Sequence, residues 1–132
     1  MSGTTANLNN TGDTFDTGND SIVIVSNLET IPGGKTLDVT GFTPLVIPAG
    51  HVVIEETSTG VLKPMPVTGA NYAALPASHT YKGIVISSVL TAKPFVGIMV
   101  RGSMNKNASK YGIASILTAL ETALPLIRFT KD

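Results

Sequence analysis

The sequence predicts a mainly β fold with one short α-helix, arranged as a small antiparallel barrel-like or sandwich-like domain behind a flexible N-terminal arm. Three observations predict it: short β-branched runs separated by turn residues, one helical stripe near the C-terminus, and a first segment that is almost entirely polar. The length of 132 residues fits one domain. We therefore expect an arm at residues 1–20 and a single β-rich domain at residues 21–132.

Residues 1–20 contain too few apolar side chains to form a core. Apart from Met1, Ala6, Leu8 and Phe15, every residue is Ser, Thr, Gly, Asn or Asp. Ordering a backbone costs about 1–2 kcal/mol per residue, which burial of so few apolar groups does not offset. We expect this arm to be flexible in isolation and to anchor on a partner through Leu8 and Phe15. The alternative is a terminal segment without a role.

The chain up to residue 90 reads as short strands joined by proline and glycine turns. The expected strands span residues 22–25, 35–39, 43–47, 51–56, 61–62 and 82–90, with turns at 32–34 and 48–50. The strand at 61–62 continues toward Pro64 and Pro66, which have no backbone N–H to donate. We therefore expect that segment to lie at an edge of the sheet or to leave it.

The next strand, at residues 95–101, is apolar on both faces. Phe95, Gly97 and Met99 share one face, and the residues between them place apolar side chains on the other. We expect a neighbouring subunit to cover the second face, with Phe95, Gly97, Met99 and Arg101 at the interface. A closed barrel filled by the helix is the alternative. Gly97 indicates a bend, a bulge or the close approach of another backbone.

An amphipathic helix is expected at residues 108–124. Its apolar positions recur at three- and four-residue steps: Tyr111, Ile113, Ala114, Ile116, Leu117, Leu120 and Leu124. Asn107 or Ser109 can cap its start, and Pro125 ends it. A last short strand is expected at residues 126–130.

The composition favours a protein that assembles. Only 14% of the residues are charged, against about 25% in an average domain, and 42% are hydrophobic. A protein covered by partners tolerates such a surface, although a monomer coated with Thr, Ser and Asn would have the same composition. The formal net charge of zero argues against nucleic-acid binding. No apolar run is long enough to span a bilayer and no secretory signal is visible, so we expect a soluble protein made in a cytoplasm.

The sequence contains little from which to build an active site. His51 and His79 have no carboxylate at a ligand-like spacing, and we expect ordinary surface or turn roles for both. Glu55 and Glu56 are adjacent on a strand and therefore point to opposite faces. The aspartates of the arm lack the spacing of a calcium loop, and there is no cysteine. We expect no enzyme activity, no catalytic residue, no metal and no cofactor.

Three stretches carry a family resemblance: "TPLVIPAGHVVIEETSTGVLKPM", "YKGIVISSV" and "GIMVRGSMNKN", followed by the closing helix and strand. In this order they resemble the lambda-type head decoration proteins of tailed phages, over about residues 43–130. Residues 21–42 hold two strand candidates outside that pattern. The resemblance implies a β-rich fold, a homotrimer on the outer surface of the virion capsid, and an arm that becomes ordered on the major capsid protein.

These observations lead to a functional expectation. We expect a structural virion protein that binds the outer surface of a phage capsid as an oligomer and stabilises the head. The expected capsid-binding residues are Leu8, Phe15, Ile22, Val23, Ile24 and Val25, since an extended arm can add a strand to an exposed sheet edge and several arms bind together. The alternative is a small receptor- or carbohydrate-binding head domain of a virion fibre, which would use Tyr72 and Tyr81.

Overall fold

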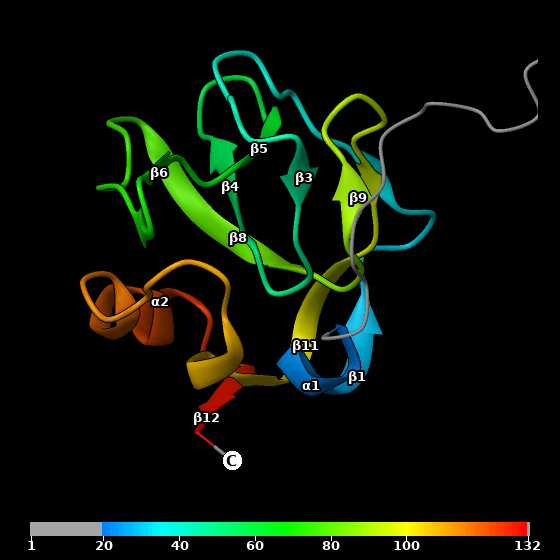
Figure 1. Ribbon diagram of the computed structural model, residues 1–132. Helices are drawn as coiled ribbons and strands as arrows, with labels where there is room; N and C mark the ends of the chain where they lie inside the picture. Colours follow the sequence, from blue (N-terminus) through cyan, green and yellow to red (C-terminus); the bar gives the residue numbers. More distant parts are fainter. Residues whose placement is uncertain (1–19, 132) are drawn as a thin grey trace, which may run out of the picture.

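The computed structural model describes residues 20–131, which form a mainly β fold with short helices (Figure 1). In chain order the elements are α1 (Asp20–Val23), β1 (Ile24–Thr30), β2 (Lys35–Thr36), β3 (Val46–Ile47), β4 (Val52–Glu56), β5 (Leu62–Pro64), β6 (Val67–Thr68), β7 (Asn71–Tyr72), β8 (His79–Val85), β9 (Val89–Leu90), β10 (Phe95–Val96), β11 (Ile98–Asn105), the 3₁₀ helix η1 (Lys106–Ala108), α2 (Leu117–Ala123) and β12 (Ile127–Thr130). The predicted fold class is confirmed.

The largest sheet has the strand order β1-β11-β8-β4-β5, and β12 adds to β11 as a parallel partner. The other pairs in this sheet are antiparallel. Three small two-stranded sheets, β10-β2, β3-β9 and β6-β7, surround it. Since β1 and β5 remain edges, the sheet does not close into a barrel, and the arrangement is sandwich-like. The proline-containing return strand lies at an edge, as predicted, with Pro64 as the last residue of β5.

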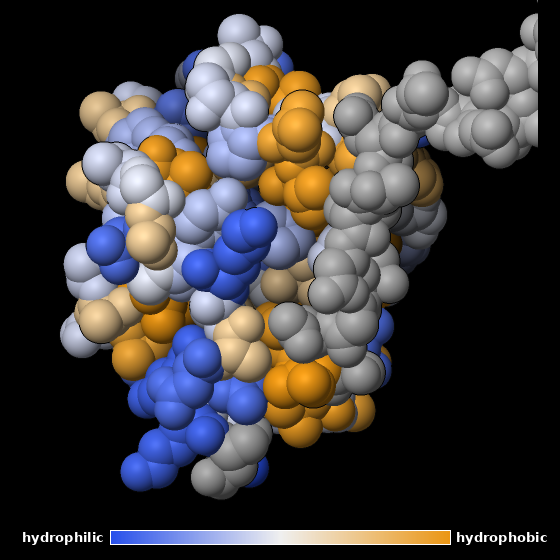
Figure 2. Space-filling model, in the orientation of Figure 1, coloured by the Kyte–Doolittle hydropathy of each residue, from blue (hydrophilic) through white to orange (hydrophobic). Residues whose placement is uncertain are grey.

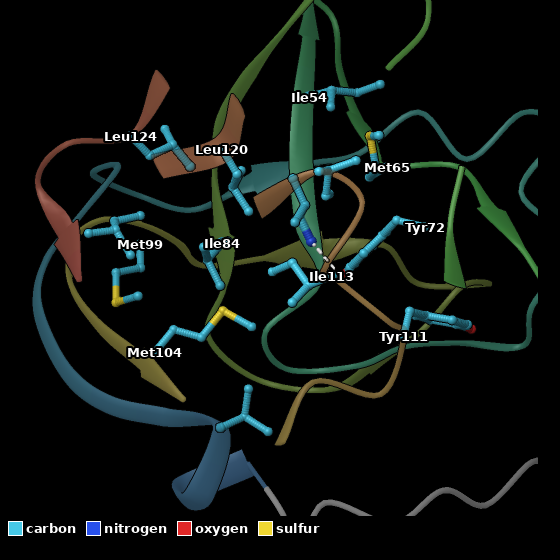
Figure 3. Close-up of a cluster of buried hydrophobic side chains, with 14 residues drawn as sticks. Ile54, Met65, Tyr72, Ile84, Met99, Met104, Tyr111, Ile113, Leu120 and Leu124 are labelled. Carbon is cyan, nitrogen blue, oxygen red and sulfur yellow. Dashed lines mark hydrogen bonds between the residues drawn. The ribbon is translucent and has the colours of Figure 1, made fainter. Parts of the chain in front are cut away.

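The sheet separates two hydrophobic cores. Neighbouring residues on one strand alternate between them: Val52 and Val53 on β4, Ile84 and Val85 on β8, and Ile98 and Met99 on β11. The helix-side core contains Val52, Ile54, Ile84, Met99 and Met104 with Tyr72, Tyr111, Ile113, Ile116, Leu120 and Leu124 (Figure 3). The loop-side core contains Val53, Val85, Ile98 and Val96 with Leu37, Ile47 and Leu62. Both faces are therefore covered by the chain itself.

This arrangement corrects the expectation for residues 95–101. Ile98 and Met99 are both fully buried, one in each core, so no neighbouring subunit is needed to cover either side chain. The strand is also divided at Gly97, where β10 pairs with β2 and β11 pairs with β1 and β8. A Cβ atom at Gly97 would lie 2.6 Å from Cδ1 of Ile86, so the close packing of Ile86 on this position depends on the absence of a side chain.

The predicted helix is much shorter than its apolar stripe. Only Leu117–Ala123 are α-helical, because Gly112 pairs with the β6-β7 hairpin instead of continuing a helix. The Gly112 N–H donates to the Ala70 carbonyl at 2.7 Å, and the Gly112 carbonyl accepts from the Tyr72 N–H at 3.1 Å. Asn105 caps η1, so neither Asn107 nor Ser109 caps α2 as expected. The helix ends before Pro125, as predicted, and β12 follows.

Several strands are shorter than the sequence predicts. The segments expected at 35–39 and 43–47 contain strands only at Lys35–Thr36 and Val46–Ile47, and the strand expected at 82–90 is divided into β8, which begins earlier at His79 and ends at Val85, and β9 at Val89–Leu90. Their remaining residues make isolated backbone bonds, such as Leu37 N–H to the Pro94 carbonyl at 2.9 Å, in the loop before β10, and Asp38 N–H to the Leu62 carbonyl at 2.8 Å, on β5. Isolated backbone bonds of this kind, instead of a continuous ladder, connect the segments that cover the loop-side core.

Candidate interaction surface

Strand β1 is an exposed edge with an irregular ladder. It pairs with β11 antiparallel, and the register shifts between Ile24 and Ser26 and again between Asn27 and Glu29. Each shift leaves one residue of β1 outside the ladder, namely Val25 and Leu28, and both side chains are exposed. A bulge twists an edge and hinders the addition of another strand. The edge therefore presents apolar side chains, and it is poorly suited to backbone pairing.

Large apolar side chains are exposed on α1, on β1 and just before β3. Ile22 of α1 and Val25 of β1 are each 53% exposed, and Leu45, just before β3, is 69% exposed. Figure 2 shows hydrophobic surface over α1 and again over β3 and β9, on the same side of the molecule. We call Ile22, Val25 and Leu45 the apolar flank. Burial of each such side chain is worth about 1.5–3 kcal/mol, so the flank is suited to contact with another protein.

A hydrogen-bond network ties α1 to the β3-β9 region. The Asp20 carboxylate accepts from the Ser88 backbone N–H at 2.8 Å and from the Ser88 hydroxyl at 2.7 Å. The same hydroxyl accepts from the Ala49 N–H at 3.0 Å. Val23 is buried beside Gly50, whose φ of +85° and lack of a Cβ make room for it. The two parts of the apolar flank are therefore held in a fixed relation.

This geometry corrects the expected role of residues 22–25 as a free docking strand. Val23 belongs to α1 and is buried, and Ile24 is paired with Met104 on β11 of the same chain. Ile22 and Val25 remain exposed and available to a partner. Leu8 and Phe15 lie outside the described residues. Asp20, expected at the end of the arm, is already fixed to Ser88.

The four residues expected at a subunit interface occupy different environments. Phe95 is 60% exposed and covers Gly34, and Arg101 is exposed on β11 opposite Glu29 of β1. Gly97 is half-buried, and Met99 is fully buried. Met99 is therefore a core residue and does not lie on a surface that a second subunit could contact. Phe95 and Arg101 remain candidates for such a contact.

His51 is a core residue, which corrects the expectation of a surface or turn role. It is fully buried, and the rings of Phe42, Tyr72 and Tyr111 surround it with centroid separations of 5.2–5.5 Å. Its Nε2 donates to the Met65 carbonyl at 2.9 Å, and its Nδ1 has no partner among residues 20–131. Burial lowers the pKa of His51 to about 4, partly opposed by the bond to Met65. The neutral imidazole of His51 therefore acts as a packed core side chain.

Glu55 and Glu56 of β4 each form a surface ion pair. The Lys63 amine donates to Glu56 at 3.2 Å, and Lys82 lies 3.6 Å from Glu55. The hydrogen bond from Lys63 is the main cause of the lowered pKa of Glu56. The two glutamates thus have separate partners. Within residues 20–131 no three His, Asp or Glu side chains gather in a way that could hold a metal ion. In the same part of the chain, every helix is too short to traverse a lipid bilayer.

A groove of about 630 Å³ lies between residues 31–38 and the β4-β5 hairpin. Charged side chains line it, Lys35, Asp38, Glu55 and Lys82 among them, and no aromatic residue does. Tyr72, which a carbohydrate site would need at the surface, is buried, and its hydroxyl accepts from the Val52 N–H at 3.1 Å (Figure 3). Tyr81 is only half-buried but packs against the helix-side core. An aromatic platform for sugars does not form at these residues.

No protein-family model, curated protein or solved structure matches this chain. Its function is therefore inferred from its own residues and geometry.

The sequence did not indicate Asp20, Ser88, Leu28 or Leu45 as functional residues. The Asp20–Ser88 contact joins residues that are 68 positions apart, and no local pattern relates them. Leu28 and Val25 are exposed because of bulges, which an alternation pattern does not reveal. Leu45 follows Pro44 inside an apolar run, which reads as a buried strand.

Proposed function

We propose that this chain is a structural virion protein that binds the outer surface of a phage capsid as an oligomer and stabilises the head. The observation that supports it best is the apolar flank. Both faces of the sheet are filled by the chain itself, yet Ile22, Val25 and Leu45 remain exposed. A well-packed domain that leaves such groups outside gains stability when a partner covers them.

The proposed partners are the major capsid protein and further copies of the chain, as a homotrimer. Cementing a shell needs contact area and multivalency, and it needs no catalytic group. When several copies are linked in one oligomer, binding of one copy to the capsid raises the effective concentration of the other copies at neighbouring sites. The oligomer therefore binds tightly even if each copy binds weakly. A ligand that binds only the assembled lattice stabilises it by mass action.

The flank and the interface have different candidate residues. We assign capsid contact to the apolar flank together with Leu8 and Phe15 of the N-terminal segment, and subunit contact to Phe95 and Arg101. The receptor- or carbohydrate-binding alternative is the weaker proposal, because its expected aromatic residue Tyr72 is in the core. Its best remaining location is the charged groove beside the β4-β5 hairpin.

The test is binding of purified variants to expanded capsids that lack the chain, measured by co-sedimentation. The triple variant I22S/V25S/L45S should lose at least about tenfold in affinity, because three desolvated apolar contacts are removed. The matched control is Leu126→Ser, since Leu126 is 63% exposed but lies between α2 and β12. Equal binding by the triple variant and the control would contradict the proposed capsid contact.

Oligomeric state is measured separately, by size-exclusion chromatography with light scattering. The wild-type chain should elute as a trimer at high concentration, and Phe95→Ser with Arg101→Ser should shift it toward the monomer. A strict monomer with saturable affinity for a glycan would instead favour the fibre-head alternative. These two measurements separate capsid contact from subunit contact.

A further inference from the structure

Four packed rings join separate segments of the chain at the residue before β4. The His51 ring lies between three others, from Phe42 of the loop before β3, Tyr72 of β7 and Tyr111 of the segment before α2. Tyr72 and Tyr111 also contact each other, with ring centroids 5.7 Å apart (Figure 3). We call these four residues the aromatic box, and His51 is its central member.

The box has no group that would stabilise a charged imidazole. The Nε2 atom of His51 donates to the Met65 carbonyl, and Nδ1 has no partner among residues 20–131. The titratable groups of this part of the chain that face the ring are Tyr72 and Tyr111, and burial raises the pKa of both, so they are neutral. Burial lowers the pKa of His51, and no carboxylate contributes to that shift. The glutamates of β4 lie in surface ion pairs. A proton on Nδ1 would therefore place a buried charge and an unpaired donor inside the box.

The backbone of His51 closes a turn that the box supports. The His51 N–H donates to the Pro48 carbonyl at 3.1 Å, so residues 48–51 form a β-turn. Gly50 occupies the third position of this turn with a φ of +85°. The Tyr72 hydroxyl donates to the Gly50 carbonyl at 3.4 Å. The turn is therefore held to the box both through His51 itself and through Tyr72.

Two contacts attach α1 to the same turn. Val23 of α1 lies against Gly50, where a Cβ atom would collide with it. The Ala49 N–H donates to the Ser88 hydroxyl, which itself donates to the Asp20 carboxylate. α1 carries one part of the apolar flank, and β3, which follows the exposed leucine of the flank, ends directly before the turn. Both parts of the flank therefore meet at residues 48–51.

From this arrangement we propose that the aromatic box is an acid-sensitive switch that controls the apolar flank. When His51 takes up a proton, its ring leaves the box, the turn at 48–51 loosens, and α1 separates from the turn. The effect on capsid contact rests on the proposed function. A flank whose parts are no longer fixed binds more weakly, because ordering them again opposes association.

The size of the effect follows from the two protonation equilibria of His51. In the open form the ring is in water and has its ordinary pKa of 6.5, whereas burial lowers the pKa in the closed box to about 4. Protonation therefore favours the open form once the pH falls below 6.5. The equilibrium constant for opening should be at least about tenfold larger at pH 5 than at pH 7.

The test is amide hydrogen exchange, measured by NMR on the free full-length chain at pH 7 and pH 5. Protection factors correct for the intrinsic effect of pH on exchange. They should fall at least about tenfold at pH 5 for Ala49, His51 and Ser88, whose N–H groups hold the turn and α1. Ile31 and Leu37 also donate backbone bonds, but β2 and β10 beside them contribute no ring to the box, and both should keep their protection. An equal fall in both sets would mean that acid unfolds the whole chain, which would overturn the switch.

Two histidine variants identify the titrating group. His51→Gln should remove the pH dependence, because glutamine does not titrate in this range. His79→Gln is the matched control and should retain it, since His79 is half-buried on β8 and its ring contacts the Ala77 carbonyl and the Lys63 amine outside the box. A tenfold fall that persists in His51→Gln would overturn the proposal and make Asp20 the group to examine.

The wild-type chain supplies a measurement that does not depend on the folding of a variant. The bond to Met65 requires the proton on Nε2 and none on Nδ1. The imidazole ¹⁵N chemical shifts of His51 at pH 7 should therefore be those of this neutral tautomer, and a proton on Nδ1 at pH 7 would overturn the proposal. All of these measurements use the free chain, so their failure leaves the proposed capsid contact standing, and a failure to bind capsids leaves the switch standing.

Discussion

The two cores of this protein differ in what covers the sheet. The helix-side core is closed by α2 and the irregular segment before it, and it encloses a histidine and two tyrosines together with several methionines. The loop-side core is smaller, and its buried residues are all aliphatic, with the partly buried Phe42 packed against them. The comparison teaches that the helix-side face encloses a titratable group, His51, whereas the loop-side face is held by aliphatic packing and isolated backbone hydrogen bonds.

The largest expected effect is the loss of a side chain that joins α2 to the sheet. Leu120 is fully buried in the helix-side core, so Leu120→Ala should lower the free energy of unfolding by about 2–5 kcal/mol. Urea unfolding followed by circular dichroism measures it. Leu126→Ala, at an exposed position just after α2, should change it by less than about 0.5 kcal/mol. A small loss for Leu120→Ala would mean that α2 does not close this core.

The second prediction separates the two cores by pH. The folded-state pKa of His51 is about 4 and its ordinary value is 6.5, so the unfolded chain takes up the proton more readily. The stability due to neutral His51 is complete above pH 6.5, decreases below it, and is lost near pH 4. The full loss corresponds to about 3 kcal/mol.

Urea unfolding at intervals between pH 4 and pH 7 measures this dependence. Carboxylates also titrate near the acidic end, so the wild-type chain is compared with His51→Gln. The variant is expected to be less stable at pH 7, because the packing against three rings changes, and to have a flatter profile between pH 6.5 and 4. Parallel profiles in the two proteins would remove His51 as the cause.

The third prediction concerns the link from α1 to the turn after β8. Ser88→Ala removes a hydroxyl that donates to Asp20 and accepts from the Ala49 N–H. We expect a loss of about 1–3 kcal/mol, since a charged acceptor and a buried donor both lose a partner. Hydrogen exchange should accelerate in α1 and the first residues of β1. Unchanged exchange there would contradict the role of Ser88 in fixing the start of the domain.

The smallest expected effect on stability is at the apolar flank. Val25→Ser should change the free energy of unfolding by less than about 0.5 kcal/mol, because Val25 is exposed and lies outside the β1-β11 ladder. Urea unfolding of the isolated chain checks it. A loss similar to that of Leu120→Ala would place Val25 in the folded core and remove it from the proposed contact surface.

Parts of the central sheet could be predicted from the sequence because its strands are short and separated by turns. Residues 51–56 were expected as a strand, and β4 spans Val52–Glu56. Pro64 indicated an edge strand because proline lacks an N–H, and it ends β5. Ile116, Leu120 and Leu124 were expected on an apolar stripe, and all three are buried. A local sequence pattern is sufficient to predict a structural element when the interactions that form the element are also local.

Other features depend on contacts between distant segments. The stripe at 108–124 predicted a helix, but Gly112 pairs with the β6-β7 hairpin, and tertiary hydrogen bonds override the helical period. His51 is neutral and buried because three aromatic rings from separate segments surround it. The sequence of β11 could not show which residues bury Met99. Alternation shows that one face of a strand is apolar, but it does not show whether the same chain or a second chain covers that face.

The most direct test of the proposed contact is hydrogen exchange by mass spectrometry on the free chain and on the chain bound to expanded capsids. If the apolar flank makes the contact, protection on binding should appear in α1, in the first half of β1 and around β3 and β9. The segment from α2 to β12, which includes exposed Leu126, should exchange as in the free chain. Protection confined to α2 and β12, with none around α1 and β3, would contradict the proposal.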